Sequence, residues 1–259
     1  MTHQPVDLYY ESYGKGFPVI FLHGFSLSHV IWEAIIPFLK AEARLILPDL
    51  RGHGNSPAPE GPYTMRMMAE DVLALMDKLG LDKAVWVGHS MGGYICQAAA
   101  RDYQERLAGL AFIATRSQAD TVDKNEARLR TIEQVYQHGV SVVAEDMSER
   151  LTYQSGWQPT NFEIINKTPL PGVIGSLQGM ASRPDSSDLV RDLSLPWVFV
   201  VGRKDLFVPL ETAREMAAPL APLHYFEVPE AGHMPMMEAP EIVAQAIRTL
   251  LSELKVDGD

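Results

Sequence analysis

Short runs of consecutive hydrophobic residues recur along the chain. They are rich in Val, Ile, Phe and Trp and lack polar alternation, which is typical of strands buried on both faces of a parallel sheet. These runs occupy residues 18–22, 45–48, 84–87, 110–114 and 197–201. We therefore expect strands at these five places.

Between the runs, hydrophobic residues return with the period of an amphipathic helix. Residues 64–80 show this period, with Thr64 placed to cap the helix start and Gly80 to end it. A second such segment begins at Pro240, a residue that the first turn of a helix tolerates. The alternation of strands and helices predicts an α/β fold with a mostly parallel central sheet flanked by helices.

One connection is much longer than a strand crossover requires. The segment from residue 116 to residue 195 contains 80 residues, whereas a crossover needs about a dozen. Within it, residues 125–138, 140–151 and 177–191 are predicted to be helical and residues 157–171 irregular. We expect a single domain over residues 1–259, with a core of residues 1–115 and 196–259 and a helical cap at about 116–195, here called the inserted segment.

Composition and charge narrow the class of protein. The chain is 46% hydrophobic and 21% charged, which provides for a large core, and its net charge of −11 disfavours nucleic acid and anionic membrane surfaces as partners. The single cysteine, Cys96, allows no internal disulfide and no cysteine-based zinc site. No signal peptide or membrane span is evident. We expect a soluble cytoplasmic protein, and the sequence indicates no oligomeric state.

The motif with the clearest chemistry is Gly88-His89-Ser90-Met91-Gly92-Gly93, which follows the predicted strand at residues 84–87 and opens a helix. Small residues two positions before and after a serine permit a tight strand-to-helix turn that exposes the serine hydroxyl at the sheet edge. This arrangement makes Ser90 a candidate nucleophile.

A serine nucleophile needs a base and a group that orients the base. Asp205 follows the predicted strand at residues 197–201 within a short loop, and His233 follows the last predicted strand. Both therefore reach the same sheet edge as Ser90, in the chain order Ser, Asp, His that this type of fold uses. The inserted segment also holds Asp185 and Asp188, but neither follows a strand, so position favours Asp205.

With these residues in place, the chain resembles the α/β-hydrolase superfamily, in particular its small esterase-like, enol-lactonase-like and haloperoxidase-like serine hydrolases. Matching marks are His23-Gly24-Phe25, the residues 49–56, the Ser90 elbow, the residues 202–205 and Gly232-His233. The resemblance implies a cap between the sixth and seventh family strands. It also implies an oxyanion hole formed by the backbone amides of Phe25 and Met91.

The resulting hypothesis is a serine hydrolase that cleaves carboxylic esters of small to medium size through an acyl-enzyme. The catalytic residues would be Ser90, Asp205 and His233. The inserted segment would roof an apolar pocket, together with a residue next to the catalytic histidine. The side chains expected to line this pocket are Trp157, Phe162, Leu177, Met180 and Met234.

No cofactor or metal is expected, because the sequence has no cluster of metal ligands and no phosphate-binding loop. The segment Gly52-His53-Gly54 lacks the third glycine and the following helix of a dinucleotide-binding loop.

The bond that is cleaved stays open. A lactonase similar to 3-oxoadipate enol-lactonase is one alternative, for which Arg150 or Arg183 would have to bind the substrate's carboxylate. Carbon–carbon bond hydrolases and perhydrolases use the same three residues. From a different class, the fold also serves as a ligand receptor. In each case the partner is a small molecule, with an ester or a lactone favoured.

Overall fold

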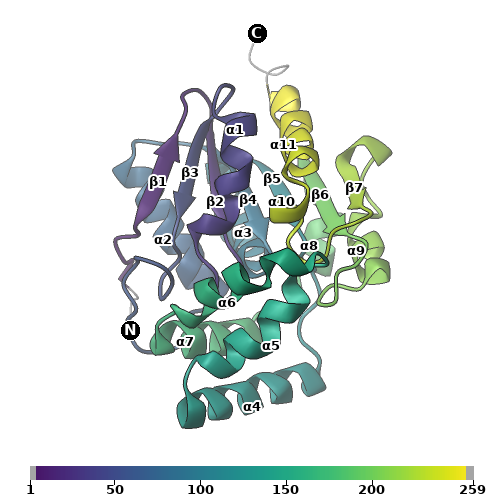
Figure 1. Ribbon diagram of the computed structural model, residues 1–259. Coiled ribbons are helices and arrows are strands. Elements are labelled where there is room, and N and C mark those ends of the chain that lie inside the picture. The colour runs from purple at the N-terminus through teal and green to yellow at the C-terminus, as the bar shows by residue number, and fades with distance from the viewer. Residues whose placement is uncertain (1–3, 255–259) are drawn as a thin grey trace.

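Seven strands form one sheet in the computed structural model, which describes residues 4–254 (Figure 1). Their order across the sheet is β1-β3-β2-β4-β5-β6-β7. Only β1 is antiparallel, to its neighbour β3, and all other neighbours are parallel. The strands are β1 (Tyr10–Tyr13), β2 (Pro18–Leu22), β3 (Arg44–Pro48), β4 (Ala84–His89), β5 (Leu107–Ile113), β6 (Trp197–Gly202) and β7 (Tyr225–Val228).

The mostly parallel α/β sheet predicted from the hydrophobic runs is confirmed. Every residue of β4 and of β6 is buried, as expected for strands covered on both faces. The edge strand β1 has no fully buried residue. Its sequence lacks the hydrophobic run by which the central strands were predicted.

Helices cover both faces of the sheet (Figure 1). One face is covered by α1 (Ile36–Leu39) and α11 (Pro240–Leu254), and the other by α2 (Met65–Lys78) and α3 (Met91–Asp102). Thr64 caps α2 as predicted, because its side chain accepts a hydrogen bond from the amide of Met67, and Gly80 ends this region with a φ of 66°. Further short elements are η1 (His29–Ile35), η2 (Gln104–Arg106), α9 (Leu210–Ala217), η4 (Pro222–His224) and α10 (Pro235–Glu238).

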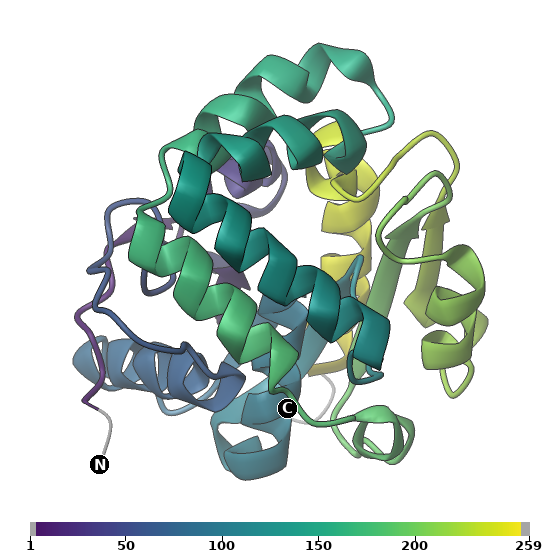
Figure 2. The same ribbon diagram turned by 90° about the horizontal axis from the view of Figure 1, so that it is seen from below.

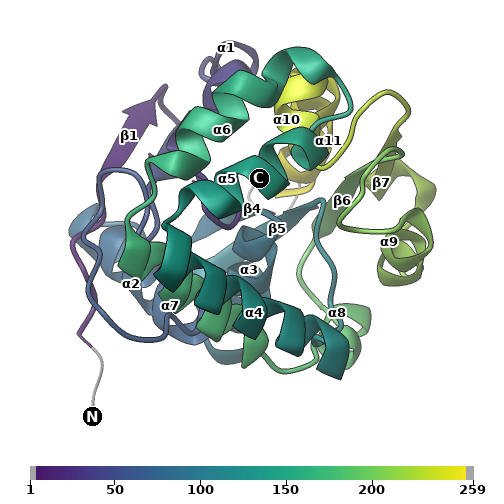
Figure 3. The same cartoon turned by 60° about the horizontal axis from the view of Figure 1, so that its bottom comes forward.

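The inserted segment is helical and lies across the edge of the sheet at which the parallel strands end (Figures 2 and 3). It connects β5 to β6. Its helices are α4 (Val122–His138), α5 (Ser141–Leu151), η3 (Ser155–Trp157), α6 (Gln158–Asn166), α7 (Leu170–Ala181) and α8 (Ser187–Arg191). No helix within residues 4–254 is both long and apolar enough to cross a membrane.

The prediction of irregular structure for residues 157–171 was wrong, since this stretch holds α6 and the start of α7. This stretch contains Pro159 and Pro171. Both occupy the first turn of a helix, where a proline costs no hydrogen bond.

Candidate active site

Ser90 lies in a sharp turn between β4 and α3, with φ of 50° and ψ of −110°. The surrounding backbone leaves no room for side chains on the neighbouring glycines. A Cβ on Gly88 would lie 2.5 Å from the carbonyl oxygen of Gly92, and a Cβ on Gly92 would lie 2.4 Å from the carbonyl oxygen of Leu22. These contacts explain the motif, because a residue with a side chain at either position would push the turn apart.

Two hydrogen bonds from β5 and the residues after it hold the turn in place. The amide of Ser90 donates to the carbonyl of Ile113 at 2.9 Å, and the hydroxyl of Thr115 donates to the carbonyl of Ser90 at 2.8 Å. The strained backbone of Ser90 is therefore fixed by hydrogen bonds to the neighbouring strand β5 and to the residues that follow it.

Asp205 and His233 are hydrogen-bonded to each other. Oδ2 of Asp205 lies 2.8 Å from Nδ1 of His233, and their side chains are 0% and 4% exposed. The other oxygen, Oδ1, accepts hydrogen bonds from the amides of Phe207 (2.7 Å) and Val208 (3.0 Å). A carboxylate oxygen can only accept, so Nδ1 of His233 carries the proton and Nε2 is left with a free lone pair.

The backbone around His233 is tied to the inserted segment. The amide of His233 donates to the carbonyl of Leu151 at 2.8 Å, at the end of α5. Glu238 accepts hydrogen bonds from the amides of Gly232 (2.7 Å) and Gln154 (2.9 Å). Burial raises the pKa of Glu238, and these two amides, which lower it, only partly offset that effect.

A second histidine, His89, is hydrogen-bonded to the backbone of the loop that contains His233. Its Nε2 lies 2.9 Å from the carbonyl oxygen of His233, and burial holds its pKa well below the ordinary value. His89 is therefore neutral and donates its Nε2 proton to that carbonyl. The sequence analysis assigned it no role, because an x position of a Gly-x-Ser-x-Gly motif carries no signal of its own.

The loop that contains Phe25 is held by two neutral histidines. The amide of Leu50 donates to Nε2 of His23 at 2.9 Å, and the amide of Ser26 donates to Nε2 of His53 at 3.2 Å. Burial lowers the pKa of His23 to about 4 and that of His53 to about 3. Both rings are thus acceptors at neutral pH, and they position a loop rather than move protons.

The amides of Phe25 and Met91 lie on two segments that meet next to Ser90. Met91 is the first residue of α3, where an amide has no carbonyl one turn earlier to bond to. Within residues 4–254, no backbone carbonyl accepts a hydrogen bond from the amide of Phe25. Among the described residues, the two amides expected to form an oxyanion hole therefore have no backbone acceptor.

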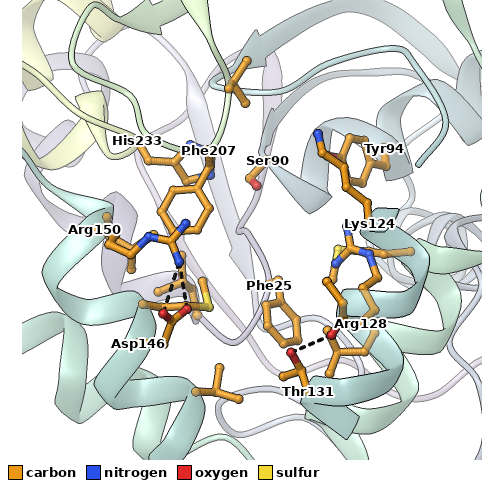
Figure 4. A pocket seen from close by; sticks show the side chains of 18 of the residues that line it. Phe25, Ser90, Tyr94, Lys124, Arg128, Thr131, Asp146, Arg150, Phe207 and His233 are labelled. Atoms are coloured by element: carbon orange, nitrogen blue, oxygen red, sulfur yellow. Dashed lines mark hydrogen bonds and ion pairs between the residues drawn. The ribbon is translucent and has the colours of Figure 1, made fainter. Parts of the chain in front are cut away.

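Ser90 and His233 face one cavity of about 360 Å³ (Figure 4). Its walls come from the loops after β2, β4, β5, β6 and β7, from α3, and from α4, α5 and α7 of the inserted segment. The apolar side chains on its walls include those of Phe25, Leu27, Ala127, Val142, Val143, Met147, Leu151, Leu177, Met180, Phe207 and Val208.

Of the residues predicted to line the pocket, Leu177 and Met180 do so. Trp157, Phe162 and Met234 do not belong to the wall of this cavity. Phe162 lies on α6, which packs against α5, and Trp157 lies on η3, which packs against α6. The cavity wall on this side is made by α5. Met234 is fully buried in the core, although it follows His233 directly.

Of the two arginines that the sequence analysis named as candidate carboxylate ligands, Arg150 lines the cavity and Arg183 does not. The cavity also has charged and aromatic residues that the sequence analysis did not identify. Phe207 follows Asp205 in the loop after β6, and its ring centroid lies 4.8 Å from that of His233. The guanidinium of Arg150 stands over the same ring at 4.7 Å and pairs with Asp146. Lys124 and Arg128 of α4 lie on the opposite side of Ser90 (Figure 4). Tertiary packing decides which face of a helix is turned toward a cavity. The period of hydrophobic residues in the sequence does not determine this.

Among the described residues 4–254, no group of three or more His, Cys, Asp or Glu side chains is arranged to hold a metal ion. Burial also raises the pKa of the Cys96 thiol, so Cys96 stays protonated inside the core. The reactive groups that the structure brings to the cavity are the hydroxyl of Ser90 and the imidazole of His233, which is hydrogen-bonded to Asp205.

Comparison with known protein sequences gives relatives over nearly the whole chain. It is 25% identical to 3-oxoadipate enol-lactonase 2 of Acinetobacter baylyi, covering 97% of this chain and 95% of that protein. It is 28% identical to the pimeloyl-[acyl-carrier protein] methyl ester esterase of Edwardsiella ictaluri, covering 93% and 95%.

Comparison with solved structures also gives relatives that cover nearly the whole chain. A thermophilic esterase from Thermogutta terrifontis, solved with malate bound, is 40% identical and superposes with a TM-score of 0.91, covering 96% of this chain and 94% of that one. The enol-lactonase of Burkholderia xenovorans shares the fold, with a TM-score of 0.86 at 22% identity over 95% and 96% of the two chains. Residues 18–153 match the family model described as the alpha/beta hydrolase fold. Since this match covers more than half of the chain, the protein belongs to the α/β-hydrolase family.

Proposed function

We propose that the protein is a serine hydrolase that cleaves carboxylic esters of small to medium size. Oγ of Ser90 attacks the ester carbonyl carbon while Nε2 of His233 takes the hydroxyl proton. The carbonyl oxygen becomes an oxyanion and accepts hydrogen bonds from the amides of Phe25 and Met91. Asp205 keeps its negative charge throughout and stabilises the imidazolium that forms on His233.

The second half of the reaction uses the same groups. The bond between the carbonyl carbon and the alcohol oxygen breaks, and that oxygen takes the proton from Nε2 of His233. The acyl group stays on Ser90. A water molecule then gives a proton to His233 and attacks the acyl carbon, and the acid leaves as Ser90 regains its proton.

The observation that carries this proposal is a strained serine in a cavity that it shares with a histidine already oriented by a buried carboxylate. A backbone held at positive φ on a non-glycine residue costs free energy, and such strain is found mainly at functional sites. The 40% identical esterase and the methyl ester esterase relative support ester cleavage.

Lactone cleavage is a second candidate, because a relative that matches 97% of this chain is named an enol-lactonase. The same attack by Ser90 opens a lactone, and the leaving oxygen then stays attached to the acyl group. The two candidates differ only in the substrate that the cavity accepts.

The test is hydrolysis of p-nitrophenyl esters of increasing acyl length, and of a matched series of lactones, by the wild type and by Ser90→Ala. Ser155→Ala, on the exposed η3, serves as the control variant. We expect Ser90→Ala to lose at least 10³-fold in kcat, roughly what removing a triad member costs, and the control to be unchanged.

A covalent phosphonate probe then identifies the nucleophile by mass spectrometry. A wild type no faster than Ser90→Ala on every ester and lactone would exclude the proposed function. A phosphonate adduct on any residue other than Ser90 would exclude the assigned nucleophile.

A further inference from the structure

Three arginines surround a single buried carboxylate next to the cavity. The side chain of Asp120 is completely buried and pairs with Arg116, Arg128 and Arg183. The Nε of Arg128 lies 2.5 Å from Oδ2, and Nη2 of Arg183 lies 2.9 Å from Oδ1. Burial alone would raise the pKa of Asp120, but the hydrogen bonds from Arg183 and Arg128 bring it to about 2. Asp120 is thus fully ionised, and the cluster keeps an excess of two positive charges.

The excess charge is only partly compensated by other protein groups. The Nε atoms of Arg116 and Arg183 are buried, and within residues 4–254 neither has a hydrogen-bond partner. Arg183 also lies against the ring of Tyr94, at 4.1 Å from its centroid, and Tyr94 is a wall residue of the cavity. Burying three guanidinium groups beside one carboxylate costs free energy, because the positive charges are not fully neutralised. A bound anion would reduce this cost.

Two of these arginines line the cavity, and a lysine lines it as well. Arg116, Arg128 and Lys124 all line it. Lys124 precedes Arg128 by four residues on α4, so the two side chains lie on the same face of the helix. Like charges at this spacing destabilise a helix. Lys124 forms no ion pair with any of the described residues 4–254.

The acidic residue on the cavity wall, Asp146, lies on the other side. It pairs with Arg150 at 2.9 Å and belongs to α5, next to Phe207 (Figure 4). The end of the cavity at α4 is therefore positive, in a chain whose net charge is −11. This local reversal of sign is not a consequence of the overall composition.

We propose that Lys124 and Arg128, with Arg116 beside them, bind a free carboxylate on the acyl part of the substrate. This inference rests on the proposed function. His233 must protonate the leaving oxygen, so the alcohol part lies on the His233 side of Ser90. Lys124 and Arg128 lie on the opposite side (Figure 4), where the acyl chain extends.

Much of the cavity wall is apolar, and Leu27, Leu177 and Met180 contribute to it. A largely apolar cavity with polar groups at its two ends suits a short methylene chain. The substrate class is therefore half-esters of short dicarboxylic acids, or lactones that open to give such an acid.

The experiment compares the mono-p-nitrophenyl ester of glutaric acid with p-nitrophenyl glutaramate, in which a neutral amide of the same size replaces the free carboxylate. We expect the wild type to have a kcat/KM at least tenfold higher for the acid than for the amide. This ratio should fall as sodium chloride is added, because salt screens the attraction.

Lys124→Ala should lower the acid-to-amide ratio at least fivefold, mainly through KM, while kcat/KM for the amide stays within about twofold of wild type. The control is Arg130→Ala on the same helix, since the Arg130 side chain is 65% exposed and paired with Glu126. The control should leave both values unchanged.

Three outcomes separate this inference from the proposed function. If the wild type hydrolyses the amide as fast as the acid, or if Lys124→Ala slows both substrates equally, the carboxylate site is refuted and the hydrolase proposal stands. If neither ester is hydrolysed, the hydrolase proposal fails. The site is then tested alone by calorimetry on Ser90→Ala protein, where glutarate should bind more tightly than glutaramate, and equal binding would refute it.

Discussion

The strained turn at Ser90 leads to a prediction about stability that is independent of any substrate. Ser90 has φ of 50° and ψ of −110°, a conformation that costs a residue with a Cβ about 2 kcal/mol. Glycine adopts it without that cost. We therefore expect Ser90→Gly to be more stable than Ser90→Ala, which keeps the Cβ, although both variants lose the Ser90 hydroxyl.

The size of the effect follows from two opposing contributions. Relief of strain stabilises Ser90→Gly, whereas the greater freedom of glycine in the unfolded chain costs about 0.7 kcal/mol. The net gain over Ser90→Ala is about 1 kcal/mol. For a chain of 259 residues, with an unfolding entropy of about 2.1 cal/mol/K per residue, this corresponds to a Tm higher by about 2 °C.

The assay is thermal unfolding of both variants, followed by calorimetry or circular dichroism. Ser182 provides the matched control, because it is exposed, ends α7 with an ordinary φ of −90° and loses the same hydroxyl in either variant. At this position glycine should be less stable than alanine. A Tm of Ser90→Gly equal to or below that of Ser90→Ala would refute the claim that the backbone of Ser90 is strained.

Three further predictions concern the site and the core. Asp205→Asn should fold and react slowly with a phosphonate. Its kcat should be reduced on the order of 10⁴-fold, because the asparagine amide no longer fixes the tautomer of His233. A loss of less than tenfold in a steady-state ester assay would contradict the role proposed for Asp205. The pKa of His23 is lowered from 6.5 to about 4 by burial, so the unfolded chain binds more protons below pH 6.5. The free energy of unfolding, measured by urea titration, should therefore fall by up to about 3 kcal/mol between pH 6.5 and pH 4. The fall should be smaller in His23→Gln. An equal pH dependence of the two proteins would contradict the lowered pKa of His23. Cys96 is buried with a raised pKa, so a thiol reagent should modify it only after unfolding, and rapid labelling of the native protein would show that the core opens.

The sequence predicted the parts of the molecule that depend on local chemistry. The tight turn at Ser90 requires glycines at fixed positions, and a carboxylate or imidazole directly after a buried strand must emerge at the carboxyl edge of a parallel sheet. Asp205 and His233 were recognisable for this reason. Their chemical roles stay predictions until the assays above are done.

The parts that depend on packing between helices were not predictable in the same way. Lys124 and Arg128 belong to α4, which has only one buried residue, Val135, so its hydrophobic pattern does not show which face is turned inward. Trp157 and Phe162 were expected at the cavity because they are large and apolar, yet the neighbouring α5 occupies that wall. Asp120 and its arginines come together from positions up to 67 residues apart in the sequence.

The hydrogen bonds at the end of α5 limit which helical segments could replace the inserted segment of this chain. Leu151 and Gln154 belong to the segment that shapes the cavity, yet their backbone groups bond to His233 and to Glu238, which also holds Gly232. A foreign helical segment grafted here would bring a new cavity wall and would also leave the backbone of His233 without one of its hydrogen bonds. Chimaeras that retain residues 151–154 are thus the ones in which specificity can be altered without loss of turnover.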